Sequence, residues 1–344
     1  MMGNAKVLPA VRRIAWRGVR IAGWIFVVAV LIGMTAWAAL AVCFADLSLA
    51  RPRYVMASLV VVVTLAALLL IRPRRLKWVA PLPVFVVVLV WYLTRSASND
   101  RDWRYDVARV ATADLDGDRL VVHNVRDFAF WSATEAVPAW DERTYDLGRI
   151  KTVDLVLCYW GSKSIAHAIA SFGFDDGQFL AVSIETRLER GEAQSSLQSL
   201  FRQYELVYVF ADERDVLRVR TNHRGEDVYL YRTRMTPTQA RAVLISYVTR
   251  ANGLARQAEW YNTVTANCAT SVLPHARAAG APGRMSLDVL LSGHAARQAY
   301  GNGLLNTRLP FDELERRSLI NSAANAAEND PDFSKRIRES LPME

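Results

Sequence analysis

Cys268 is the residue of this sequence best placed to act as a nucleophile. It lies in "YNTVTANCATSV", where Asn267 is a good helix N-cap and the residues after it have the pattern of a first helical turn. A sulfur at that position is close to unpaired backbone N–H groups and to the positive end of the helix dipole, which stabilise a thiolate. The pattern predicts a nucleophilic thiol, and the same N–H groups can bind an oxyanion.

His167 is the histidine with a context that suits a general base, in "AHAIASFGFDDGQFLAVSIETRLERGE". The "DDG" between two apolar runs predicts a three-residue hairpin loop with Gly177 in the left-handed conformation. Phe174 then faces Gln178, and His167 falls opposite Glu185 on the same sheet face. A carboxylate beside an imidazole can fix its tautomer and stabilise its charged form. A purely structural histidine–glutamate pair is the alternative.

The other histidines and cysteines have weaker settings. His123 is expected to be a core or hydrogen-bonded residue of a strand, whereas His275 and His294 stand in polar surroundings and are expected to be exposed. Cys158, inside the apolar run "VDLVLCYWG", is expected in the core. A disulfide between Cys158 and Cys268 is the alternative, because an extracytoplasmic location is oxidising.

Three residues beside these groups are candidates for substrate binding. Arg187 and Arg190 follow Glu185 closely and are candidates for contact with anionic headgroups, although charges at a strand end are commonly only solvated. Asn267 is the third candidate. The sequence contains neither a metal-ligand cluster nor a glycine-rich phosphate loop, so neither a metal nor a cofactor is expected.

Three uncharged runs near the N-terminus predict a membrane anchor over residues 1–95. The chain has 344 residues, of which 52% are hydrophobic. The runs cover residues 21–44, 54–71 and 79–93, and a helix of about 20 residues crosses the hydrocarbon core of a bilayer. The third run is the shortest, and aromatic residues flank both of its ends. A cleaved signal peptide is the alternative for the first run.

Basic residues in the flanks of these runs predict the orientation. Five Lys or Arg residues precede the first run, two follow it, and four lie between the second and the third. Because basic flanks stay in the cytoplasm, the N-terminus is expected to be cytoplasmic. Three crossings then place the rest of the chain in the periplasm or outside the cell.

The high net charge of +8 belongs to the anchor. Residues 1–95 hold 12 of the 42 Lys and Arg residues and 1 of the 34 Asp and Glu residues, which leaves 30 basic and 33 acidic residues in the remainder. A nucleic-acid-binding domain needs a basic patch on its folded surface. The balance therefore argues against a nucleic-acid partner.

After a polar linker, short strands come first and helices later, which predicts an α+β fold with an antiparallel sheet. Alternation and turn signals predict seven strands, at 107–114, 120–125, 153–160, 165–174, 179–186, 206–210 and 227–233. Thr236, Pro237 and Gln239 form the start signal of a helix that Gly253 should end. Residues 311–341 are expected to form two amphipathic helices broken near Pro331.

Ordered sequence blocks resemble the family defined by the Lnb N-terminal periplasmic domain. They include "HNVRDFAFW", "VDLVLCYWG", "AHAIASFGF", "LAVSIETRLERGE", "FRQYELVYVFADERD" and "YNTVTANCATSV". The resemblance runs from about residue 105 to 305. We accordingly divide the chain into the anchor (1–95), an Lnb-like catalytic domain (100–309) and a C-terminal helical tail (310–344). In this family the periplasmic domain is named as N-terminal, whereas here the apolar runs come first.

The resemblance implies a function as well as a fold. Lnb proteins are lipoprotein intramolecular transacylases, so the resemblance implies a bacterial inner-membrane protein whose Cys268 and His167 transfer an acyl group from a lipoprotein or membrane lipid. A nucleophilic cysteine at a helix start is papain-like, and the order of histidine before cysteine is that of permuted members. Two alternatives remain: a cysteine peptidase or amidase acting on cell-wall peptides, and a non-catalytic membrane-tethered interaction module. The oligomeric state is not indicated.

Overall fold

The computed structural model describes residues 7–45, 52–73, 76–265, 268–280 and 292–342, without the side chains of residues 7–15, 268, 269 and 273. The chain divides into two compact units, and each is described by itself. The first comprises Met1–Ser96 with Phe201–Gln203, and the second comprises Ala97–Leu200 with Tyr204–Glu344.

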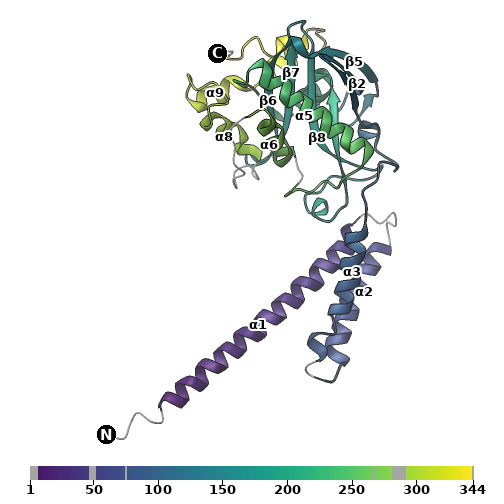
Figure 1. The fold of residues 1–344 in the computed structure, drawn as a ribbon, viewed down its shortest axis with the longest axis vertical. Helices are drawn as coiled ribbons and strands as arrows, with labels where there is room; N and C mark the ends of the chain where they lie inside the picture. The colour runs from purple at the N-terminus through teal and green to yellow at the C-terminus, as the bar shows by residue number, and fades with distance from the viewer. Residues whose placement is uncertain (1–6, 46–51, 74–75, 266–267, 281–291, 343–344) are drawn as a thin grey trace. The chain divides into compact units, whose positions relative to one another are not determined.

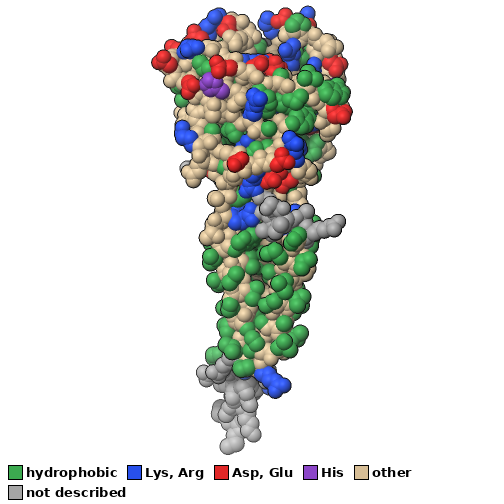
Figure 2. All heavy atoms as spheres, turned by 90° about the vertical axis from the view of Figure 1, so that its right-hand side faces the viewer, with side chains coloured by type: hydrophobic (Ala, Val, Ile, Leu, Met, Phe, Trp, Pro, Cys, Tyr) green, Lys and Arg blue, Asp and Glu red, His purple; other side chains and the backbone are tan. Residues whose placement is uncertain are grey.

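The first unit is built from apolar helices: α1 (Val7–Phe44), α2 (Pro52–Leu70), the short turn η1 (Leu76–Trp78) and α3 (Leu82–Thr94). Small residues such as Ala38, Ala41 and Ala57 lie in their common core. Three stretches, Trp16–Phe44, Pro52–Leu70 and Leu76–Thr94, are long and apolar enough to cross a membrane. The three predicted spans are thus confirmed as helices of suitable length and composition. Figure 2 shows hydrophobic side chains gathered over these helices.

The second unit is a mixed α+β domain, which confirms the predicted fold class (Figure 1). Its main sheet has the order β1-β2-β9-β8-β7-β6-β10, with β5 paired to β2. Among the strand pairs that the structure describes, only β2 and β9 run parallel. The strands are β1 (Thr112–Asp116), β2 (Arg119–Arg126), β5 (Trp140–Asp146), β6 (Ile150–Tyr159), β7 (Ala166–Phe174), β8 (Phe179–Arg187), β9 (Glu205–Ala211) and β10 (Asp227–Arg232). A small hairpin is formed by β3 (Ala129–Phe130) and β4 (Ala136–Val137).

All seven predicted strands are present, with shifted ends. The first begins at Thr112 rather than Val107, because the η2 turn (Tyr105–Val107) precedes it. β5 has no counterpart among the predicted strands. Its sequence "WDERTYD" is mostly charged or polar and largely solvent-facing, so it lacks a clear alternation.

Two helices, α5 (Pro237–Arg256) and α6 (Cys268–Ala278), cover one face of the sheet (Figure 1). The predicted capping box between Thr236 and Gln239 is present at the start of α5. The predicted stop at Gly253 is wrong, since α5 continues to Arg256. An isolated glycine is tolerated in a helix, and the buried Leu254 holds the last turn in the core.

The opposite face is covered by α4 (Glu213–Val216), the π-helical turn η5 (Val219–His223) and the C-terminal helices. The latter are α10 (Asn321–Ala326) and α11 (Phe333–Arg336), while α8 (Ala295–Gly301) and α9 (Phe311–Ser318) lie near β10 and β6. The tail therefore has three short helices instead of the two predicted, with the expected break at Pro331. Buried Arg338 joins the tail to α4 through Glu213 (2.6 Å) and to β6 through Asp154 (2.9 Å), and both carboxylates are fully buried.

Candidate functional site

The β7–β8 hairpin has the register predicted from its turn. Gly177 has φ +85°, and its N–H donates to the carbonyl of Phe174. The paired residues run from Gly173 with Phe179 to Ile169 with Ser183, so that the two numbers of every pair add to 352. Because side chains alternate along a strand, this register places His167, Ser183 and Glu185 on one face.

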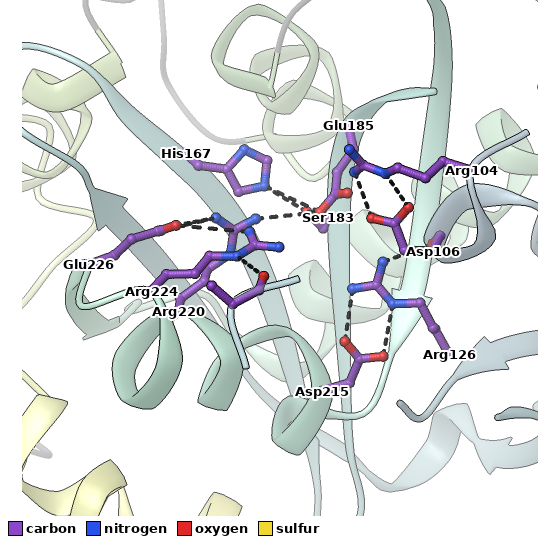
Figure 3. Close-up of polar contacts among 11 residues, drawn as sticks. Arg104, Asp106, Arg126, His167, Ser183, Glu185, Asp215, Arg220, Arg224 and Glu226 are labelled. Carbon is purple, nitrogen blue, oxygen red and sulfur yellow. Dashed lines mark hydrogen bonds and ion pairs between the residues drawn. The ribbon is translucent and has the colours of Figure 1, made fainter. Parts of the chain in front are cut away.

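These three side chains form a continuous hydrogen-bonded chain (Figure 3). Nε2 of His167 lies 2.6 Å from Oγ of Ser183, and that hydroxyl donates to Oε1 of Glu185 at 2.7 Å. Nε2 and Oε1 are themselves 3.9 Å apart. The predicted neighbourhood of His167 and Glu185 is present, but buried Ser183 bridges them.

The bridge determines the tautomer of His167. A serine hydroxyl has a single proton, and in Ser183 this proton points to the carboxylate of Glu185. Oγ must therefore accept a hydrogen bond from Nε2–H of His167. The lone pair then resides on Nδ1, for which the described residues provide no hydrogen-bond partner. The described structure thus leaves Nδ1, the basic nitrogen of His167, available to accept a proton.

Charge and burial set the protonation states of this chain. Burial alone would raise the pKa of Glu185, but the nearby charges of Arg126 and Arg220 outweigh it and bring the pKa to about 2. Burial, followed by the charge of Arg220, lowers the pKa of His167 to about 3. At neutral pH the pair is a carboxylate and a neutral imidazole, and a neutral imidazole is the form that can accept a proton.

A cavity of about 240 Å³ opens where β7 and β8 part. The β7–β8 pairing ends at Ile169 and Ser183, whereas β6–β7 and β8–β9 remain paired further toward this end of the sheet. His167 of β7 and Ile184, Glu185 and Thr186 of β8 line the cavity. The cavity therefore lies at the end of the hairpin where the two strands are no longer paired.

α6 begins at Cys268, at the predicted helix start. Its Val272 packs against the core on the α5 side of the sheet, which is the face opposite to His167. The side chain of Cys268 and the whole of Asn267 lie outside the described residues. The predicted approach of the thiol to His167 and the predicted roles of Asn267 therefore stay predictions.

Cys158 lies on β6 directly across from His167 and is fully buried, as predicted for a core residue. It packs in the cluster that contains Val156 and Ile169. A thiol with no exposed surface cannot meet a substrate ester without a rearrangement of the core. Its location thus disfavours Cys158 as the nucleophile, although it neighbours the same histidine.

The two arginines predicted to bind substrate have different settings. Arg187 is buried, its guanidinium donates to Val107, Asn99 and Ala108, and it stacks on a tryptophan at 4.1 Å. It therefore holds internal groups together in this structure. Arg190 is exposed and lies 3.1 Å from Asp102, an exposed carboxylate.

The remaining histidines lie elsewhere. His123 is hydrogen-bonded as predicted, between Asp114 (2.9 Å) and Glu142 (2.8 Å), at the outer part of the sheet. His294 is exposed, as expected. The expected exposure of His275 is wrong, because it is buried between the hydroxyls of Tyr208 and Ser246. Burial lowers its pKa to about 4.

Several residues of the cavity were not indicated by sequence patterns. Ser183 sits in an apolar strand as an ordinary small residue, and the only available signal is its place two residues before Glu185. Arg104, Arg126, Arg220 and Arg224 also line the cavity, from segments far apart in the sequence. Among the described residues, no group of three or more His, Cys, Asp and Glu side chains is arranged to hold a metal ion.

Comparison with known proteins assigns this region to a family. Residues 136–292 match the family model of the Lnb N-terminal periplasmic domain. No match was found among curated proteins or among solved structures. The matched segment includes the hairpin with His167, Ser183 and Glu185 and the whole of α6. The resemblance seen in the sequence is therefore confirmed over residues 136–292, which are similar to the Lnb N-terminal periplasmic domain.

Proposed function

We propose that this protein is a membrane-anchored cysteine acyltransferase or acyl hydrolase that acts on acyl esters of lipoproteins or membrane lipids outside the cytoplasm. The observation that carries the proposal is the His167–Ser183–Glu185 chain, which lines a cavity and leaves Nδ1 of a neutral imidazole available. The family match and the position of Cys268 at the start of α6 support it.

In the first step, Nδ1 of His167 takes the proton of the Cys268 thiol. The thiolate sulfur attacks the ester carbonyl carbon, and backbone N–H groups at the start of α6 stabilise the oxyanion. Collapse of the tetrahedral intermediate breaks the bond to the ester oxygen, which receives the proton from the imidazolium. A thioester on Cys268 and a free alcohol result.

In the second step, an amine or water attacks the thioester carbon and regenerates the thiol. His167 takes a proton from the attacking group and returns it to the departing sulfur. Glu185 stabilises the imidazolium through Ser183 in both steps, since its carboxylate stays ionised. An amine acceptor makes the protein a transferase, and water makes it a hydrolase.

The mechanism requires the thiol of Cys268 to reach the cavity beside His167. α6 packs on one sheet face and His167 points to the other, and the β7–β8 pairing ends at Ile169 and Ser183, before His167 is reached. The proposal therefore requires the thiol to approach through the part of the hairpin where the two strands are no longer paired.

The apolar helices of the first unit support a substrate from the bilayer, because a domain tethered to a membrane meets the acyl esters of lipids and lipoproteins at its surface. With the basic flanks of the apolar helices, we place the N-terminus in the cytoplasm and this domain in the periplasm, anchored in the inner membrane.

Product analysis tests the proposal. Full-length protein in maltoside micelles is mixed with a synthetic diacylated lipopeptide, and mass spectrometry follows the N-acylated lipopeptide and free fatty acid. We expect the wild type to form one of these two products. Cys268→Ala should form neither product, whereas the matched variant Cys158→Ala should form the same product as the wild type. Cleavage of peptidoglycan peptides without any acyl product would favour the peptidase, and inertness toward both substrates would favour the interaction module.

A further inference from the structure

Two arginines on one short turn project into the cavity beside Glu185 (Figure 3). Arg220 belongs to η5, and Arg224 is the residue that ends this turn. The side chain of Arg220 is 9% exposed and that of Arg224 is 34% exposed. A π-helical turn is rare and is frequently found at functional sites.

Most hydrogen-bond donors of these two guanidinium groups have no partner among the residues that the structure describes. Each group has five N–H donors. Arg220 donates from Nη1 to Glu226 at 3.0 Å and from Nη2 to Glu185 at 3.5 Å, while its buried Nε has no partner among the described residues. Arg224 donates from Nε to the carbonyl of Ala133 at 3.3 Å.

The carboxylates of the cavity compensate the positive charge of Arg224 only weakly. Arg104 and Arg126 each bind a carboxylate through two nitrogens, on Asp106 and Asp215, at 2.6–2.8 Å. In the described parts of the chain, the carboxylate oxygen nearest to Arg224 belongs to Glu226, is 3.9 Å away and already binds Arg220. Burial, followed by the charge of Arg220, lowers the pKa of Arg224.

We propose that Arg220 and Arg224 bind the phosphate of a glycerophospholipid, which is one of the acyl donors that the proposed reaction allows. A phosphodiester offers several acceptor oxygens to two converging guanidinium groups. The cavity of about 240 Å³ is below the range of about 300–1,000 Å³ typical of drug-sized ligands, so it takes a headgroup and glycerol rather than two acyl chains. The placement of the ester toward His167 rests on the proposed function, whereas the binding of phosphate does not.

Binding is measured without chemistry. Full-length Cys268→Ala protein in maltoside micelles, which contain no phosphate, is titrated with dihexanoyl phosphatidylglycerol by calorimetry, and dihexanoylglycerol is the matched ligand without phosphate. We expect binding of the phospholipid only and displacement by inorganic phosphate. Arg224→Gln should weaken binding about 10- to 100-fold, because hydrogen bonds to charged groups contribute about 1.5–3 kcal/mol. Arg224→Lys should restore part of it, and Arg234→Gln, outside this cavity, should not change it.

Equal binding of the two lipids, or an unchanged affinity in Arg224→Gln, would overturn the phosphate site. Binding of a diacylated lipopeptide with equal affinity and equal sensitivity to Arg224→Gln would also overturn it, because that donor has no phosphodiester. Phospholipid binding in Cys268→Ala, together with no acyl product from wild-type protein, would support the phosphate site and count against the proposed chemistry.

Discussion

Replacement of Ser183 by alanine should slow acyl transfer without removing any group that contacts the substrate. The change deletes the hydroxyl that accepts from Nε2 of His167 at 2.6 Å and donates to Glu185 at 2.7 Å. Nε2 and Oε1 would remain 3.9 Å apart, too far for a direct hydrogen bond. The imidazole loses both its orientation and its link to the carboxylate.

The size of the effect follows from the charge that His167 acquires. Before proton transfer the imidazole is neutral, and a neutral hydrogen bond contributes about 1 kcal/mol. After proton transfer the imidazolium is charged, and such a hydrogen bond contributes about 1.5–3 kcal/mol. The difference of about 0.5–2 kcal/mol slows the reaction by about 2- to 30-fold, since about 1.4 kcal/mol corresponds to a factor of ten. His167→Ala removes the base itself and should cost two or more orders of magnitude.

Initial rates of acyl transfer at saturating lipopeptide measure this effect, and thermal melts of Ser183→Ala control for folding. Nitrogen NMR of labelled histidine tests its cause, because the wild type should show the Nε2–H tautomer of His167. A rate that does not fall in Ser183→Ala, or an Nδ1–H tautomer in the wild type, would refute the role of the bridge.

Four other outcomes are expected. The wild type should lose thermal stability as the pH falls from 6.5 toward 4, because the pKa of His167 is 6.5 in the unfolded chain and about 3 in the folded protein. The variant His167→Gln should lose less stability over this range, and an equal loss would contradict the lowered pKa. Gly293→Ala should lower activity, since its Cβ would lie 2.6 Å from the carbonyl carbon of Ser164 and would displace the loop before β7, the strand that carries His167. Full activity with an unchanged melting temperature would argue against this contact. Arg338→Met should reduce the free energy of unfolding by about 3–5 kcal/mol, because it leaves the buried carboxylate of Glu213 without its ion pair, whereas exposed Arg336→Met should change it little; chemical denaturation in micelles compares them. A reporter fused to the C-terminus should be active only outside the cytoplasm, and a cytoplasmic signal would exclude the proposed topology.

The local part of the site could be predicted from sequence. The "DDG" turn determines the register of β7 and β8, so the proximity of His167 and Glu185 follows from counting residues. The start of α6 at Cys268 and the capping box of α5 are also local, because they depend on residues within one turn.

The rest depends on contacts between distant segments. Ser183 acquires its role only because β7 and β8 part beyond it, and no residue type marks that point. The arginines of the cavity come from the η2 region, β2 and η5, which no periodicity connects. His275 has polar neighbours in sequence but is buried by α5 and β9 in space. Tertiary packing determines the positions of these side chains, and local sequence patterns carry no information about that packing.

Trapping of the acyl group on Cys268 tests the proposed chemistry most directly. Wild-type protein in maltoside micelles is mixed with a diacylated lipopeptide or phospholipid, quenched in acid, digested and mapped by tandem mass spectrometry. We predict a hydroxylamine-sensitive acyl group on the Cys268 peptide, present in Cys158→Ala and lost or strongly reduced in His167→Ala. An acyl group on Cys158, or unmodified Cys268 peptide while product accumulates, would contradict the assignment of the nucleophile.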